Sequence, residues 1–202
     1  CYSIKLQKSS FFYNIFKSKV EKRGHMETIF SRNFNLENTK LVWNSIPNQK
    51  ISLMPASKMS EFNFKLLHNI LPNANILSKW NKSISDKCIA CNMTETTQHM
   101  LFDCENVQRL WKLISNCLGL EIRWKQIVIG YPLDNISKKI SVFNNVISIV
   151  AHSIFKGNMF SKYNSNQQIN IYVNLKKDLY FYKQLFCKCT LFENVYFPKI
   201  MY

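Results

Sequence analysis

Four residues in one short stretch of the chain, Cys88, Cys91, His99 and Cys104, have the types and spacing of a metal site. They follow the pattern Cys-x2-Cys-x7-His-x4-Cys. Thiolates and imidazoles are the ligands that zinc prefers, and four of them complete its tetrahedral shell. We therefore predict one structural zinc ion, because four protein ligands leave no open position for a catalytic water. The alternative is that these are ordinary core residues, since thiols are often buried and inert.

The local backbone must bring two separate pairs of ligands together. The first pair suits a tight turn, and Asn92 directly after it tolerates the left-handed conformation that such turns need. On a regular helix His99 and Cys104 would lie roughly 140° apart, because each residue turns by about 100°. We therefore expect His99 in a short helical turn capped by Thr96 or Thr97. Cys104 then starts the next helix, where the helix dipole favours a thiolate.

Helices are the elements that must position this site, because apolar residues recur at helical spacing along most of the chain. The expected helices cover residues 10–23, 38–46, 58–71, 74–80, 105–118, 135–156 and 168–187. Pro72 should end the third helix, whose buried stripe includes Ile70. We expect Asp103 to cap the helix after Cys104, and Gly119 and Gly157 to end two of the later helices. Only 4 Gly and 5 Pro are present, which disfavours an all-β design. The predicted fold is mainly α, a helical domain with a small zinc-held Cys-Cys-His-Cys knuckle.

Composition limits the classes of partner. Lys and Arg number 27 against 12 Asp and Glu, which gives a net charge of +15 and favours nucleic acid or another polyanion. An AT-rich coding sequence would produce the same lysine-rich and asparagine-rich composition, so the charge alone is permissive. No apolar run is long enough to span a bilayer, and the 7 cysteines, an odd number, favour a reducing compartment over a disulfide framework. The chain opens on Cys1, and we expect it to be a fragment of a longer polypeptide.

Two segments together resemble a known family. These are FNFKLLHNILPNANILSKWN (62–81) and CIACNMTETTQHMLFDCENVQRLW (88–111). They are similar to the zinc-binding region at the C-terminus of LINE-type non-LTR retrotransposon reverse transcriptases. The shared pattern is a Leu-His pair, a Lys-Trp pair, Cys-x2-Cys, Glu-Thr, His-x-Leu-Phe, Cys and a final Trp. The sequence departs from the family at Met100, where Leu is commoner. The resemblance implies that residues 58–124 form the zinc-binding domain, with 1–57 the end of a preceding region and 125–202 a C-terminal helical segment.

The resemblance also implies a role in holding RNA template or target DNA beside a polymerase core, inside the cell, in the nucleus or cytoplasm. The side chains that we expect to contact nucleic acid surround the knuckle in sequence: Lys79, Trp80, Lys82, Lys87, Arg109 and Lys112. The lysines could bind phosphates and Trp80 could stack on an unpaired base. The alternatives are a solvated face for the lysines and core packing for Trp80. We favour the core for Trp80, because it shares helical spacing with Ile76 and Leu77.

No catalytic activity is expected from these residues alone. The two-metal chemistry of a polymerase needs neighbouring aspartates, and no two acidic residues are adjacent in this chain. There is also no glycine-rich phosphate loop and no nucleophile–base arrangement. An alternative function of another class is an architectural or protein–protein docking module with no direct nucleic-acid contact. A decayed remnant without a function is a third alternative.

Overall fold

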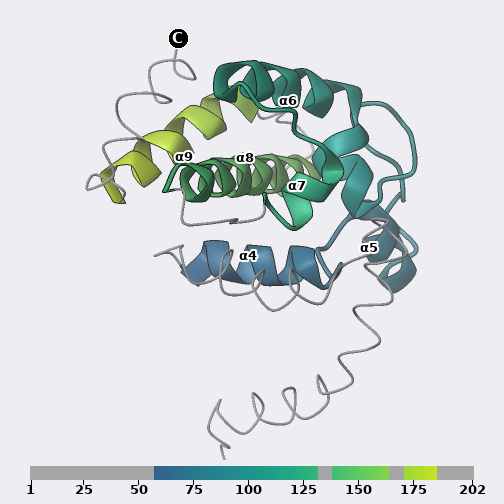
Figure 1. Cartoon of the computed structure of the whole chain (residues 1–202). Helices are drawn as coiled ribbons and strands as arrows, with labels where there is room; N and C mark the ends of the chain where they lie inside the picture. Colours follow the sequence, from purple (N-terminus) through teal and green to yellow (C-terminus); the bar gives the residue numbers. More distant parts are fainter. Residues whose placement is uncertain (1–56, 132–137, 164–170, 186–202) are drawn as a thin grey trace, which may run out of the picture. The chain divides into compact units, whose positions relative to one another are not determined.

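The computed structural model describes residues 57–131, 138–163 and 171–185, and these ranges are helical apart from their connecting loops (Figure 1). They contain no strand, only one isolated antiparallel bridge between Lys87 and Thr94. The mainly α fold with a small knuckle is thereby confirmed. The expected helices at 10–23 and 38–46 lie outside the described residues, as does nearly all of the segment 1–57. No helix of the described part is both long and apolar enough to cross a membrane.

Helix α4 (Ser57–Leu67) ends four residues earlier than the sequence predicts. Asn69 adopts the left-handed conformation (φ 53°), and the backbone N–H of Ile70 donates to the carbonyl of Lys65 at 2.9 Å. This is the helix ending in which a left-handed residue satisfies the last carbonyls, and Asn is one of the residues that accept it. The prediction for Ile70 is consequently wrong: its side chain is 54% exposed, whereas Leu71 is fully buried.

Helix α5 (Ala74–Trp80) has the predicted bounds and is capped by Asn73, whose side chain accepts the N–H of Ile76. Helix α6 (Glu105–Leu118) also agrees with the prediction, and Gly119 ends it in the left-handed conformation with φ 66°. One face of α6 is buried, through Val107, Leu110, Trp111, Ile114 and Leu118. The short helix α7 (Trp124–Val128) follows and buries Ile127 and Val128.

Helix α8 (Lys138–Tyr163) is the central element and packs against α4, α7 and the antiparallel helix α9 (Ile171–Leu185) (Figure 1). Its middle is buried on several sides, at Val146, Ile147, Ile149, Val150, Ala151 and Ile154. The prediction that α8 ends at Gly157 is wrong, because the helix continues for six further residues. Gly costs about 1 kcal/mol in a helix interior, and tertiary packing overrides such a preference. Gly157 is buried here, and the added turn carries Asn158, Ser161 and Lys162 toward the knuckle.

Candidate metal centre

The first ligand pair lies in a tight loop held by backbone hydrogen bonds. The N–H of Cys88 donates to Met93 at 2.7 Å, and the N–H of Asn92 donates back to Cys88 at 2.9 Å. Asn92 has φ 60°, so the left-handed turn expected from the sequence is confirmed. The loop thereby turns back within a few residues, and both sulfurs can face the same point.

The second pair is presented by a π-helical turn, η1 (His99–Asp103), followed by a change of direction. The hydroxyl of Thr96 accepts the N–H of His99 at 3.0 Å, which confirms the expected cap. Cys104 then has an extended backbone (φ −61°, ψ 131°) and is itself the N-cap of α6. The prediction of Asp103 as this cap is wrong, because Asp103 is still part of η1 and only Cys104 has the non-helical conformation of a cap.

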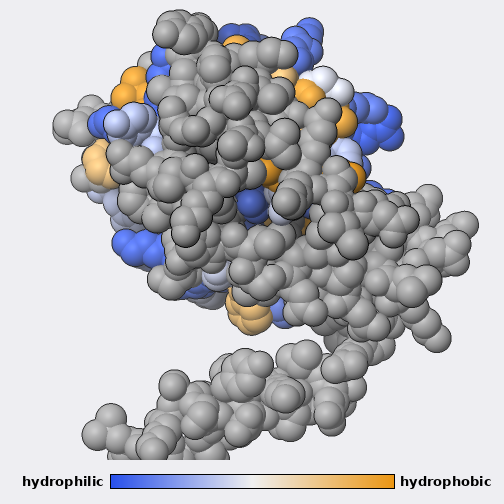
Figure 2. Space-filling view, turned by 60° about the vertical axis from the view of Figure 1, so that its left-hand side comes forward, coloured by the Kyte–Doolittle hydropathy of each residue, from blue (hydrophilic) through white to orange (hydrophobic). Residues whose placement is uncertain are grey.

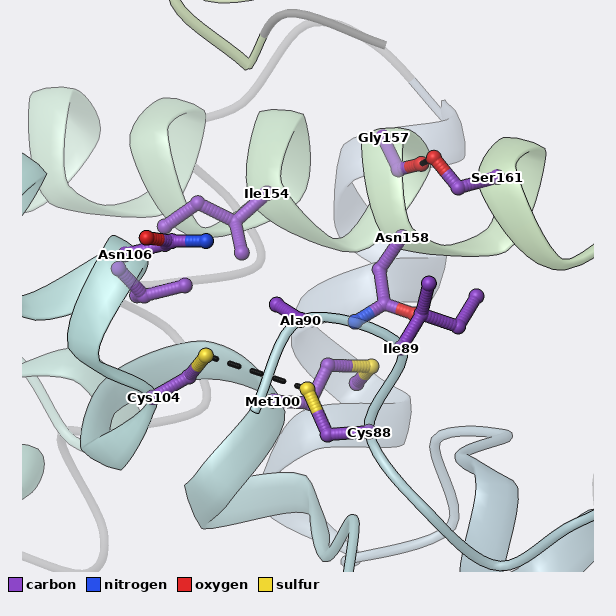
Figure 3. Close-up of a pocket in the computed structure, with 11 residues that line it drawn as sticks. Cys88, Ile89, Ala90, Met100, Cys104, Asn106, Ile154, Gly157, Asn158 and Ser161 are labelled. Carbon is purple, nitrogen blue, oxygen red and sulfur yellow. Dashed lines mark hydrogen bonds between the residues drawn. The ribbon is translucent and has the colours of Figure 1, made fainter. Parts of the chain in front are cut away.

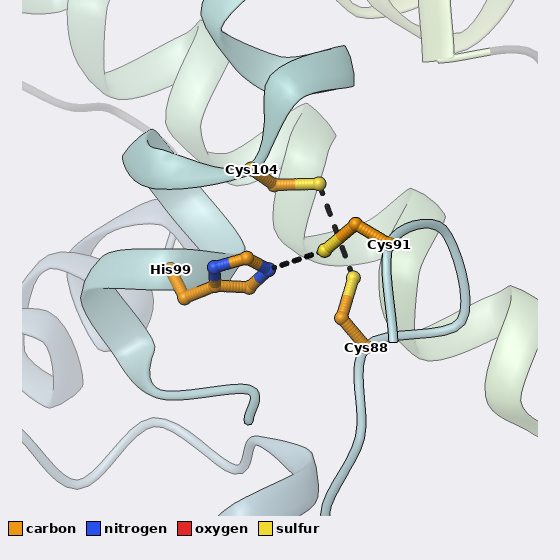
Figure 4. A group of neighbouring side chains, drawn as sticks. All are labelled: Cys88, Cys91, His99 and Cys104. Atoms are coloured by element: carbon orange, nitrogen blue, oxygen red, sulfur yellow. Dashed lines mark hydrogen bonds between the residues drawn. The ribbon is translucent and has the colours of Figure 1, made fainter. Parts of the chain in front are cut away.

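These elements bring all four predicted ligands together (Figure 4). Their ligand atoms lie within 4.8 Å of one another. Sγ of Cys88 lies 3.9 Å from Sγ of Cys104, and Sγ of Cys91 lies 3.1 Å from Nε2 of His99. Tetrahedral zinc with bonds of about 2.3 Å to sulfur separates two sulfurs by about 3.8 Å. The donor set and its spacing therefore fit one structural zinc ion.

Burial divides the four ligands into an inner and an outer pair. Cys88 and Cys104 are buried, whereas Cys91 and His99 lie toward the surface. Burial, and then the neighbouring Cys88 thiol, raise the pKa of Cys104 to about 12, although the backbone N–H of Asn106 opposes this. The zinc-free protein therefore holds Cys104 as a neutral thiol. Because zinc binds the thiolate, loading the site must release protons.

Glu95, between the two ligand pairs, connects the knuckle to α5 and α8. Its side chain is fully buried and forms an ion pair with Lys162. It also accepts the backbone N–H of Ala74 at 2.9 Å and the carboxamide of Asn158 at 3.3 Å. A fully buried carboxylate is stable only when it is paired and hydrogen-bonded, as this one is. The sequence does not indicate this role, because Glu95 stands in a polar run and Lys162 lies beyond the predicted end of α8.

Two further hydrogen bonds fix the knuckle to its neighbours. The carboxamide of Asn73 donates to the hydroxyl of Thr97 at 3.0 Å, which joins the start of α5 to the loop before His99. The indole N–H of Trp111 donates to the carbonyl of Leu101 at 2.7 Å, which satisfies a buried carbonyl of η1. Trp111 is accordingly a core residue, which confirms the prediction from its helical spacing on the buried face of α6.

The residues predicted to contact nucleic acid fall into two groups, one at the end of α5 and one on α6, and a single lysine in the knuckle. Lys79, Trp80 and Lys82 lie at the end of α5 and are exposed. The preference for Trp80 in the core is wrong: its side chain is 78% exposed. The short α5 buries Ala74 against the knuckle and leaves its last turn in solvent.

The second group stands on α6, where Arg109 and Lys112 are exposed. Arg109 is ion-paired with Glu105 at 2.5 Å, so part of its charge is already balanced. Lys87 lies in the knuckle itself and donates to the hydroxyl of Thr94 at 3.3 Å. The structure thus brings three of the six predicted residues together at the end of α5 and places the other three separately.

Comparison with known families agrees with this site. Residues 8–111, just over half of the chain, match the family described as zinc-binding in reverse transcriptase. The matched region contains all four ligands and ends at Trp111. No curated protein and no solved structure matches the chain.

Proposed function

We propose that this chain is a zinc-stabilised module that binds nucleic acid. The premise is its family: the chain belongs to the family described as zinc-binding in reverse transcriptase. In this proposal it is the C-terminal part of a LINE-type non-LTR retrotransposon reverse transcriptase. It holds RNA template or target DNA next to the polymerase core, within the nucleus or cytoplasm. It performs no chemistry itself, and the polymerase core supplies the reaction.

The observation that carries the proposal is the exposure of Trp80 between two lysines. At 78%, it is the most exposed large hydrophobic residue of the described part. Burial is the ordinary state of such a side chain, and an aromatic ring in solvent beside cations is the usual platform for an unpaired base. Lys79 and Lys82 are both exposed and can reach the phosphates on either side.

The zinc site supports the proposal by fixing this platform in place. Helix α5 has only seven residues, too few to be stable as an isolated helix. Its first turn is fixed to the knuckle by Asn73 on Thr97 and by Ala74 on Glu95. The zinc knuckle therefore determines where the last turn of α5, with Trp80, points.

The composition of the chain is compatible with a polyanion. On the face seen in Figure 2, hydrophobic residues lie next to strongly hydrophilic ones at the rim of the described part. The whole chain carries a net charge of +15. Lysine is depleted in protein–protein interfaces, so the two exposed lysines beside Trp80, Lys79 and Lys82, favour nucleic acid over a docked protein.

The experiment is a titration of a fluorescently labelled single-stranded RNA with the zinc-loaded chain, followed by anisotropy at several salt concentrations. The affinity should fall with a log–log slope near −0.7 for each phosphate contact. Trp80→Ala should weaken binding by about 1–3 kcal/mol. Lys79→Glu with Lys82→Glu should weaken binding and flatten the slope, while the zinc content stays at one equivalent.

The matched control is Lys176→Glu with Lys177→Glu, which changes the same charge on exposed lysines of α9. This variant should bind RNA more tightly than the variant with Lys79→Glu and Lys82→Glu does. Equal losses in the two double variants would mean that only total charge matters. No salt-dependent binding by the wild type would refute the proposal and favour protein docking.

A further inference from the structure

A cleft of about 240 Å³ lies between the knuckle and α8 (Figure 3). Ile89 and Ala90 of the knuckle loop line one side, Ile154 and Asn158 of α8 line the other, and Asn106 lies at the start of α6. The inner ligands Cys88 and Cys104 line the cleft, whereas the outer ligands do not. The cleft is therefore on the buried side of the metal centre, separate from its solvent-facing edge.

The lining determines the chemical class of an occupant. Apolar side chains alternate with the carboxamides of Asn106 and Asn158 and the hydroxyl of Ser161, and no acidic or basic side chain of the described part lines the cleft. A phosphate or another charged group would lose its hydration there without a counter-charge. A flat, neutral group with hydrogen-bonding edges fits, because carboxamides both donate and accept.

Asn158 offers this group a specific contact. Its Nδ2 donates to Glu95 at 3.3 Å, which fixes the orientation of the carboxamide because the opposite orientation would place Oδ1 against a carboxylate. Oδ1 is buried and has no hydrogen-bond partner within the described residues. Ile89 lies beside it in Figure 3 and is 56% exposed, so this side chain is free to move away. The position therefore lacks a hydrogen-bond donor.

We infer that this cleft binds one unpaired nucleobase that carries an exocyclic amino group, which donates to Oδ1 of Asn158. The inference rests on the proposed function, because the base belongs to the strand held at the surface. Lys87 is exposed and directly precedes Cys88, which lines the cleft, so this lysine is available to a phosphate of the same strand. Splayed-out bases read on their Watson–Crick edges are the common mode of single-strand recognition.

The test uses the full chain with one equivalent of zinc and two labelled single-stranded RNAs of equal length. One is oligoadenylate, and the other carries purine in place of adenine and so lacks only the amino groups. Oligoadenylate should bind roughly fivefold more tightly, the effect of about one hydrogen bond. Asn158→Ala should abolish this difference while the affinity for the purine strand is retained.

Because Asn158 also contacts Glu95, a second variant guards against misfolding. Asn106→Ala, at an exposed position of α6, should weaken oligoadenylate binding about threefold. Gln108 is an exposed carboxamide on α6 that does not line the cleft, so Gln108→Ala should leave the affinity for oligoadenylate unchanged. Equal, salt-dependent affinity of the wild type for both strands would refute the base-binding site in the cleft and leave the proposed function standing. Absence of binding to either strand would overturn both.

Discussion

Glu95 and Lys162 form a buried ion pair that joins the zinc knuckle to the last turn of α8. The carboxylate is fully buried and the lysine side chain is 10% exposed. The two residues are far apart in sequence, and Lys162 lies beyond residue 111, where the family match ends. The knuckle is therefore tied by buried contacts to a helix from the C-terminal part of the chain, and we expect its folding to depend on that helix.

Removal of the lysine should destabilise the protein more than removal of the carboxylate does. Lys162→Met leaves Glu95 as a buried charge with only neutral partners, which should lower the free energy of unfolding by about 3–5 kcal/mol. Glu95→Gln leaves Lys162 close enough to the surface to reach water along its aliphatic chain, so its cost should be smaller. Urea unfolding of the zinc-loaded variants measures both values.

Lys176→Met on the exposed face of α9 is the control for this pair and should change the free energy of unfolding by less than about 0.5 kcal/mol. If Lys162→Met were as stable as the control, the ion pair would contribute nothing, and the dependence of the knuckle on α8 would have to be abandoned.

Loss of zinc should unfold the knuckle and its attached elements but not the whole protein. Structural zinc contributes on the order of 10 kcal/mol to the folding of such sites. In Cys91→Ser, hydrogen exchange should accelerate in α5, η1 and the start of α6. The buried middle of α8 should keep its protection, because it packs on α4, α7 and α9.

Cys117→Ser provides the comparison, since this cysteine lies on α6 outside the ligand group. It should retain one equivalent of zinc by elemental analysis, whereas Cys91→Ser should not. Unchanged amide protection at Met100 and Leu101 in Cys91→Ser would contradict the structural role of the metal.

The ligand set, the helical fold and several helix ends could be predicted because they depend on local patterns. Four ligand types at fixed spacing identify the zinc site, and a left-handed residue at Gly119 ends α6 as glycine usually does. Gly157 carries the same signal, yet α8 continues because its next turn is stabilised by contacts with the knuckle. Long-range pairs such as Glu95 with Lys162 leave no periodic trace in the sequence. The exposure of Trp80 is missed for a related reason, since helical spacing does not reveal that no element of the described part buries the end of α5.

The stability of the protein should fall in mild acid because His152 is buried. Burial, followed by the nearby charges of Lys156 and Lys58, lowers the pKa of His152 to about 4, although Asp178 opposes this. Its ring packs against Phe62 at 5.1 Å, and its Nδ1 has no hydrogen-bond partner within the described part. The unfolded chain, with a pKa of 6.5, binds a proton that the native state rejects. The contribution of neutral His152 to the free energy of unfolding is therefore fully present above pH 6.5. It decreases by about 3 kcal/mol as the pH falls to 4.

His152→Leu separates this effect from the acid sensitivity of the zinc ligands. The substitution removes the titrating group, and because Nδ1 lacks a partner it breaks no hydrogen bond through that atom. The difference in free energy of unfolding between wild type and variant, measured by urea unfolding from pH 7.5 to 4.5, should shift in favour of the variant as the pH falls. Parallel pH profiles would mean that His152 protonates in the native state without cost.

A single methyl group added at Gly130 should destabilise the turn after α7. It has φ 84°, and a Cβ there would lie 2.9 Å from Oδ1 of Asn144. That oxygen accepts the N–H of Tyr131 at 2.7 Å, and Nδ2 donates to the carbonyl of Tyr131 at 3.0 Å. Asn144 is buried in α8 and cannot move away without losing both hydrogen bonds.

Gly119→Ala is a matched control, because Gly119 has φ 66° but open space around its Cβ position. The control should cost about 1 kcal/mol of backbone strain and melt about 3 °C below the wild type. Gly130→Ala adds the clash and should melt about 6–10 °C below it. Equal melting temperatures for the two variants would show that the Asn144 side chain can move away at no cost. Its hydrogen bonds to Tyr131 would then not hold the turn after α7 against α8.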